Sequence, residues 1–228
     1  MKKTIIYLLL AVFLAIVLQP NLGNTLKKGN DRVPENTETG YPATNDSMEL
    51  KADVSNITIC IDAENTDDVD DKESEDINLQ IAKSIGNKLR DAGYKVVYTR
   101  EDNSSMTSEQ RMAIAKQSKA DYLLSVSTNH DTNRMQKGYS IMTQNNKQLI
   151  ELSEEITAQL DTINFSEFQG LDSDHYDNFP ILTNKDIPSI LLEIGYITNE
   201  EDITKLKDET YQEKIGDAIA KSYVKIIK

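Results

Sequence analysis

Short β-prone runs alternate with amphipathic helical segments along residues 56–228. Apolar side chains recur every fourth residue from Ile77 to Leu89, and similar stripes run from Leu149 to Leu160 and from Tyr211 to Ile226. Strands are predicted at 57–61, 95–99, 121–127, 138–143, 179–182 and 189–194, with 138–143 at an edge of the sheet. This alternation predicts an α/β fold with a mostly parallel, mixed sheet of about six strands flanked by helices.

Two further helices are predicted from capping residues. Thr107 and Gln110 have the spacing of a capping box, which predicts a helix through about Gln117. Asn199 precedes Asp202 by three positions and predicts the start of a short helix near the C-terminus.

The apolar run from Ile190 to Asn199 carries one carboxylate, Glu193, and is interrupted at Gly195. A continuous apolar run is typical of a strand buried on both faces, where an unpaired charge is costly. Two interpretations of Glu193 therefore remain open at this point. It is either a core acid satisfied by hydrogen bonds or a general base at a functional site.

The first residues have a different character from the remainder. Lys2 and Lys3 precede an apolar run from Ile5 to Leu18, which predicts a signal-anchor over residues 1–20. Residues 21–55 are rich in polar residues and predict a disordered linker. The folded domain, residues 56–228, is then expected at the extracytoplasmic face of the cytoplasmic membrane, or secreted if the signal is cleaved.

Charge and residue usage exclude several function classes. The net charge of −13 argues against binding to nucleic acid, which favours basic surfaces. A single cysteine, Cys60, allows no internal disulfide and is expected as a buried core thiol. With only two histidines, His130 and His175, a zinc site built from histidine and cysteine is hard to assemble.

Polar residues follow several of the predicted strands. In open α/β sheets, ligands bind beyond the carboxyl ends of the strands, where side chains distant in sequence converge. The sequence therefore predicts a cleft rimmed by five residues: Asp62, Asn65, Ser127, Asn129 and Glu193.

A series of motifs with consistent order and spacing runs through the predicted domain. It comprises Ile59-Cys60-Ile61-Asp62, Glu75-Asp76-Ile77-Asn78-Leu79, Val97-Tyr98-Thr99-Arg100, Arg111 with Ala115, Ala120-Asp121, Ser125-Val126-Ser127-Thr128-Asn129, Gly138 and Leu192-Glu193-Ile194-Gly195-Tyr196-Ile197-Thr198-Asn199. The series resembles the zinc-dependent N-acetylmuramoyl-L-alanine amidases, which cut between muramic acid and the stem peptide of peptidoglycan. It looks most like the membrane-tethered amidases of spore-forming bacteria.

The resemblance implies a zinc ion held by His, Glu and His, with a glutamate that handles protons. The proton-handling glutamate corresponds to Glu193, whereas the three ligand positions hold Asn65, Ser74 and Ser127. Asparagine and serine are poor ligands for zinc, so no metal cofactor is expected. Arg100 matches a family arginine and is expected to pair with a buried acid.

These substitutions favour a catalytically silent amidase-family domain that binds peptidoglycan, a cell-wall amidase or a regulator of one. The alternative is an active peptidoglycan amide hydrolase with rearranged ligands, such as His130, Glu75 and Glu64. His130 and His175 are otherwise expected to be surface loop residues.

Overall fold

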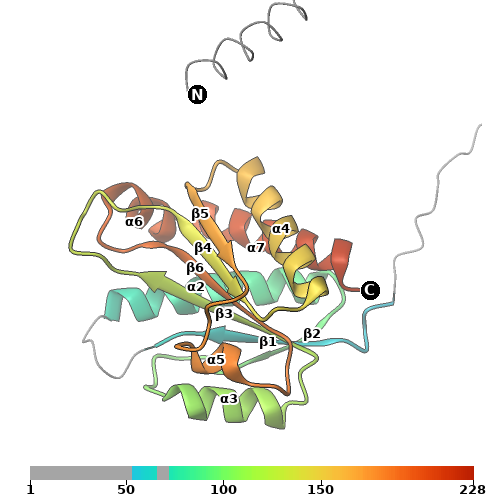
Figure 1. Ribbon diagram of the computed structural model, residues 1–228. Coiled ribbons are helices and arrows are strands. Elements are labelled where there is room, and N and C mark those ends of the chain that lie inside the picture. The colour runs from blue at the N-terminus through green and yellow to red at the C-terminus, as the bar shows by residue number, and fades with distance from the viewer. Residues whose placement is uncertain (1–52, 66–71) are drawn as a thin grey trace, which may run out of the picture. The chain divides into compact units, whose positions relative to one another are not determined.

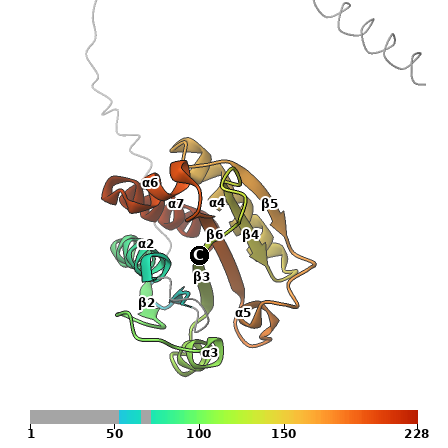
Figure 2. The ribbon, with the colours of Figure 1, turned by 90° about the vertical axis from the view of Figure 1, so that its left-hand side faces the viewer.

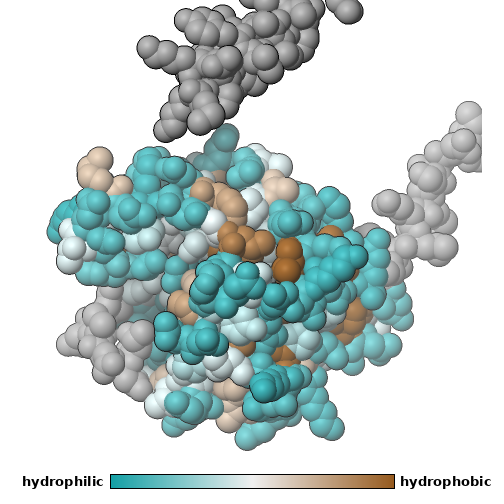
Figure 3. All heavy atoms as spheres, in the orientation of Figure 1, coloured by the Kyte–Doolittle hydropathy of each residue, from teal (hydrophilic) through white to brown (hydrophobic). Residues whose placement is uncertain are grey.

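The computed structural model of the protein describes residues 53–65 and 72–228. The predicted signal-anchor at 1–20 and all but the last three residues of the predicted linker lie outside these ranges. Within them, no helix is both long enough and apolar enough to cross a membrane. The face in Figure 3 is largely hydrophilic, with scattered hydrophobic side chains.

Six strands and six helices make up the described part of the chain. In order they are β1 (Thr58–Ala63), α2 (Lys72–Asp91), β2 (Lys95–Tyr98), α3 (Ser108–Gln117), β3 (Tyr122–Asn129), β4 (Tyr139–Thr143), α4 (Lys147–Thr162), β5 (Phe168–Asp172), α5 (Pro180–Thr183), β6 (Ser189–Tyr196), α6 (Glu200–Lys207) and α7 (Glu209–Ile226).

The strands form one mixed sheet in the order β2-β1-β3-β6-β4-β5. Neighbouring strands are parallel except β4 and β6, which are antiparallel. In Figures 1 and 2, α3 and α5 lie on one face of the sheet, and α2, α4, α6 and α7 lie on the other. The predicted fold class is therefore confirmed.

Helices on both faces explain why the central strands are apolar at successive positions. In β6, Ile190, Leu192 and Ile194 join the larger core under α2, α4 and α7. Leu191 points the other way, into a smaller core with α3 and α5. Glu193 follows Leu191 by two residues and shares its side of the sheet, because side chains alternate along a strand.

Two predictions about the strands are wrong. The segment predicted as a strand at 179–182 forms the short helix α5, whose first residue is Pro180. Proline suits the first helical position because its fixed φ is helical and its missing N–H is not needed there. The edge strand next to β4 is instead β5, which pairs with β4. The segment 138–143 is therefore internal, between β6 and β5.

Both predicted caps are confirmed. The Thr107 side chain and Gln110 form a reciprocal capping box at the start of α3. Asn199 accepts hydrogen bonds from the backbone N–H groups of Glu201 and Asp202 at the start of α6. These bonds satisfy N–H groups that have no partner within the helix.

A second buried carboxylate, Asp202, ties α6 to the end of β6. It is fully buried and accepts hydrogen bonds from the backbone N–H of Gly138 (2.8 Å) and of Tyr196 (3.0 Å). The Ser166 hydroxyl donates a third bond of 2.6 Å. Gly195, near the end of β6, has a φ of +147°, which is strained for residues with a Cβ.

Replacing this acid should destabilise the fold. Asp202→Ala leaves two buried backbone donors unpaired, so we expect the free energy of unfolding to fall by about 3 kcal/mol in urea denaturation. The exposed neighbour Glu200 supplies the control, since Glu200→Ala should change it by less than about 0.5 kcal/mol. Equal effects of the two substitutions would contradict the anchoring role of Asp202.

Candidate functional site

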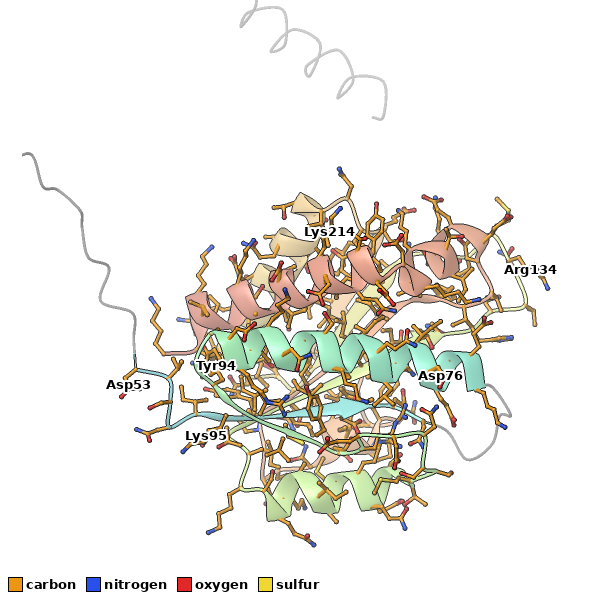
Figure 4. The ribbon with its side chains drawn as sticks, turned by 180° about the vertical axis from the view of Figure 1, so that it is seen from behind. Asp53, Asp76, Tyr94, Lys95, Arg134 and Lys214 are labelled. Carbon is orange, nitrogen blue, oxygen red and sulfur yellow. The ribbon has the colours of Figure 1, made fainter. Side chains whose placement is uncertain are left out.

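A cleft of about 280 Å³ lies at the carboxyl ends of β1 and β3, beside the first turns of α2. Its lining residues are Glu64, Asn65, Ser74, Glu75, Asn78, Ser127, Thr128, Asn129, His130 and Ile197. Figure 4 labels Asp76 and Arg134, which lie at this end of the domain, and Tyr94 and Lys95, which lie at the opposite end. Parallel strands thus bring together residues from separate parts of the chain, as the sequence predicts.

Asp62 is the exception among the predicted cleft residues. Its side chain is fully buried and does not line the cleft, because it is enclosed by partners just after β2, on β3 and on α3. The carboxylate accepts bonds from Thr99 (2.6 Å) and Ser125 (2.7 Å) and pairs with Arg111 of α3 at 2.9 Å. Asp62 is therefore a structural acid beneath the cleft.

The same arginine holds Asn65 in place. Arg111 Nη1 donates to the backbone oxygen of Asn65 (2.9 Å) and to its side-chain Oδ1 (3.2 Å). The amide nitrogen of Asn65 donates to the backbone oxygen of Ser104 at 2.9 Å. Both polar atoms of the Asn65 side chain are therefore engaged within the protein.

The two serines of the cleft are also hydrogen-bonded. Ser74, in the first turn of α2, bonds to the hydroxyl of Thr128. Ser127 donates to the backbone oxygen of Thr128 at 3.1 Å and also lies within hydrogen-bond reach of the Glu64 carboxylate. Because a hydroxyl has one proton, Ser127 can donate to only one of these acceptors at a time.

Glu193 lies between Ser127 of β3 and Ser140 of β4, its partners in the sheet register. Its Oε2 accepts hydrogen bonds from the Ser140 hydroxyl (2.7 Å) and from the amide of Asn129 (3.0 Å). The side chain is half-buried beside the cleft, and it reaches the cleft lining through Asn129. The observed geometry is that of an acid satisfied by hydrogen bonds.

Glu64 contributes a carboxylate in the cleft wall that sequence reasoning considered only as an alternative ligand. Its side chain is 30% exposed and lies 3.8 Å from Arg111. Burial raises the pKa of Glu64, and the nearby charges of Asp62 and Glu193 add to this, while the Ser127 hydrogen bond and Arg111 oppose it.

Comparison with known proteins now decides the family. The profile of the Amidase_3 family, described as N-acetylmuramoyl-L-alanine amidase, matches residues 65–224. This chain belongs to that amidase family. The match begins just after β1 and includes α2, β3 and β6, which contribute residues to the cleft or beside it.

Individual relatives support the assignment to the amidase family. YqiI, an uncharacterized protein of Bacillus subtilis (strain 168), is 32% identical over 147 residues, which are 63% of this chain and 69% of YqiI. The N-acetylmuramoyl-L-alanine amidase LytC of the same strain is 28% identical over 63% of this chain, which spans only 29% of LytC. The CwlD amidase of Clostridioides difficile, solved with the GerS lipoprotein, is 29% identical with a TM-score of 0.57, covering 75% of this chain and 98% of CwlD.

The amidase-family resemblance implies metal ligands at Asn65, Ser74 and Ser127, and these side chains do not suit zinc. An amide and two hydroxyls are weak neutral donors, whereas zinc favours imidazole, thiolate and carboxylate. All three are also committed to hydrogen bonds within the protein. The residues present at these positions therefore do not fit the metal.

The alternative ligands proposed from sequence, Glu64, Glu75 and His130, do line this same cleft. Among the described residues, however, no three His, Cys, Asp or Glu side chains are grouped so that they could hold a metal ion. His130 is exposed, as expected for a loop histidine. His175 is also exposed and lies beside Asp172, away from the cleft lining.

The role expected for Arg100 needs correction. It was expected to pair with a buried acid, but it donates instead to the backbone oxygens of Ala63 (2.7 Å), Glu64 (3.2 Å) and Glu75 (2.8 Å). Arg111 is the partner of the buried acid. Sequence reasoning also missed Asn78, Thr128 and Ile197 in the cleft; Asn78 could have been found as a polar residue between the apolar Ile77 and Leu79 of α2.

The buried ion pair beneath the cleft should be essential for stability. Asp62→Asn leaves the guanidinium of Arg111 buried without its counter-charge, so we expect a loss of about 3–5 kcal/mol in the free energy of unfolding. Asp186 forms a matched control, because it pairs with Lys116 on the exposed side of the same helix. Asp186→Asn should cost less than about 1 kcal/mol, and a similar loss in both variants would contradict this assignment.

The raised pKa of Glu64 predicts a pH-dependent effect of Glu64→Gln. An acid whose pKa is higher in the folded state destabilises the fold when it ionises, so the wild type loses stability as pH rises through that pKa. Glutamine stays neutral, so we expect Glu64→Gln to raise the melting temperature at pH 8 by more than at pH 4. Thermal denaturation across this range checks the prediction, and a larger gain at pH 4 would contradict it.

Proposed function

We propose that this protein is a catalytically silent member of the N-acetylmuramoyl-L-alanine amidase family whose cleft binds peptidoglycan or a partner protein. The proposal is carried by one observation. The three positions at which the family resemblance implies metal ligands hold Asn65, Ser74 and Ser127, each bonded within the protein. Amide hydrolysis by a bound metal requires ligands that these side chains do not supply.

The state of Glu193 supports the same conclusion. A general base must reach a water or substrate proton, whereas one oxygen of Glu193 already accepts bonds from Ser140 and Asn129. No histidine neighbours Ser127 among the described residues that it contacts, so the serine has no base to activate it as a nucleophile. Glu193 then persists as a structural acid at a former proton-handling position.

Ligand binding is the function that remains for such a cleft. Peptidoglycan is the ligand proposed first, because the chain belongs to a family of cell-wall amidases. A protein partner, such as an active amidase or its regulator, is proposed second. The CwlD amidase was solved in complex with the GerS lipoprotein, which shows that a domain of this fold can bind a protein.

The location of the protein is part of the proposal. Residues 1–20 have the composition of a signal-anchor, and an amidase-family domain meets its wall polymer outside the cytoplasm. We therefore place the domain at the extracytoplasmic face of the membrane, tethered through residues 21–55. A role in sporulation is inferred from the resemblance to membrane-tethered amidases of spore-forming bacteria.

The alternative function is an active amide hydrolase with rearranged ligands. It is favoured by one observation, namely that Glu64, Glu75 and His130 all line the cleft. Zinc needs its ligands within a few tenths of an ångström of ideal positions, so these residues would have to move on binding.

The two functions are separated by zinc content and turnover of the full-length protein. We expect elemental analysis to find less than stoichiometric zinc, and we expect no release of stem peptide from muropeptides, because no fitting ligand set is present. LytC serves as the positive control in the same assay. Co-sedimentation with insoluble peptidoglycan tests the binding function.

A different set of results would establish the alternative function, the active hydrolase. Stoichiometric zinc, together with turnover that is abolished by a chelator and by Glu193→Ala, would establish the hydrolase. Failure to co-sediment with peptidoglycan would leave a protein partner as the ligand of the cleft.

A further inference from the structure

Asn78 has a buried amide oxygen for which the described part of the structure supplies no hydrogen-bond partner. The side chain is 3% exposed and lines the cleft. Its amide nitrogen donates to the backbone oxygen of Glu64 at 3.0 Å, and this bond fixes the orientation, since two carbonyl oxygens cannot pair. Leaving a buried acceptor unpaired is costly, and a ligand that donates to it would recover this cost.

Several donors of the cleft lining, in contrast, are already engaged within the protein. Four side chains of the lining donate to or share a proton with acceptors of the protein itself: Asn65 with Ser104, Ser74 with Thr128, Ser127 with Thr128 or Glu64, and Asn129 with Glu193. The imidazole of His130 also lines the cleft, and this residue is exposed.

The lining also presents acceptors to a ligand, and two of them are carboxylates. Glu64 and Glu75 line the cleft together with Asn78, whereas no lysine or arginine is among the lining residues. Two buried cations lie behind this wall and are already engaged. Arg111 pairs with Asp62 at 2.9 Å and lies 3.8 Å from Glu64, and Arg100 donates to the backbone oxygens of Glu64 and Glu75. A ligand complementary to this wall has to present positive charge and N–H donors.

The wall also contains one apolar surface, provided by Ile197. An alkyl chain can lie against such a residue while its charged end reaches the polar atoms. The cleft volume of about 280 Å³ is at the lower limit for small-molecule sites, so it suits a group the size of an amino-acid side chain.

We propose that the cleft is an ammonium site in which Asn78 Oδ1 and the Glu64 carboxylate accept hydrogen bonds from a primary amine. The inference rests on the proposed peptidoglycan-binding function and narrows it, because the amine is assigned to the stem peptide of a peptidoglycan fragment. An ammonium group has three N–H donors and a charge, which matches an amide oxygen and a carboxylate on one wall.

The test compares two soluble muropeptides that differ only at one amine. One carries a free side-chain amine, and in the other this amine is acetylated, which removes its charge. We expect the full-length protein to bind the free-amine form roughly tenfold more tightly in calorimetric titration, as a charge-assisted hydrogen bond predicts.

Variants then assign the difference to the two acceptors. Glu64→Gln and Asn78→Leu should each reduce the preference for the free amine by roughly tenfold. Glu64→Gln keeps the size of the side chain, so it remains informative if Asn78→Leu fails to fold. Glu154→Gln on α4 and Asn87→Leu on the exposed side of α2 are the matched controls and should preserve the preference.

Each contrary result has its own meaning. Equal binding of both muropeptides, or a preference unchanged in Glu64→Gln, would overturn the ammonium site while peptidoglycan binding stands. Binding of neither muropeptide would overturn both. Tighter binding of an Nα-acetyl-lysine amide than of the free-amine muropeptide would overturn the assignment to peptidoglycan and indicate a lysine of a protein partner.

Discussion

Taking the charge of Asp62 out of water costs several kcal/mol, and the structure offsets this cost with the buried guanidinium of Arg111. The pair joins the end of β1 to α3. Hydroxyls of Thr99 and Ser125 complete the coordination of the carboxylate from the neighbouring strands. Arg111 also donates to Asn65 in the cleft wall, so the position of this wall depends on the ion pair.

The network also includes a position at which the family resemblance implies a metal ligand. Arg111 holds both the backbone and the side-chain oxygen of Asn65, so the residue that stands where a ligand is implied belongs to the structural support. Glu193 is also held within the protein, because one of its oxygens accepts hydrogen bonds from both Ser140 and Asn129. The polar residues of the cleft thus stabilise its shape, and the unpaired acceptor of Asn78 is the group left for a ligand.

The structure differs from the sequence-based prediction at β5, which was not expected, and at α5, which was expected as a strand. The segment Phe168–Asp172 contains Gly170 and has weak alternation, so nothing local marks it as a strand; it pairs because β4 offers a free edge. The segment 179–182 is apolar enough for a strand, yet Pro180 begins a helix there. For β5 the choice was made by a neighbour in space, which periodicity does not encode, whereas for α5 a proline decided against the apolar pattern.

The sequence alone determined the alternation of strands and helices, both helix caps and the convergence of Asn65, Ser127 and Asn129 at one end of the sheet. These features follow from local periodicity and from the rule that parallel strands end together. Only the tertiary structure decided which polar residue is buried and which faces the cleft. Asp62 lies within β1 and Asn65 just after it, and the reach of Arg111 from a distant helix places the carboxylate of Asp62 in the interior. Pairing of this kind depends on distances between elements far apart in the chain.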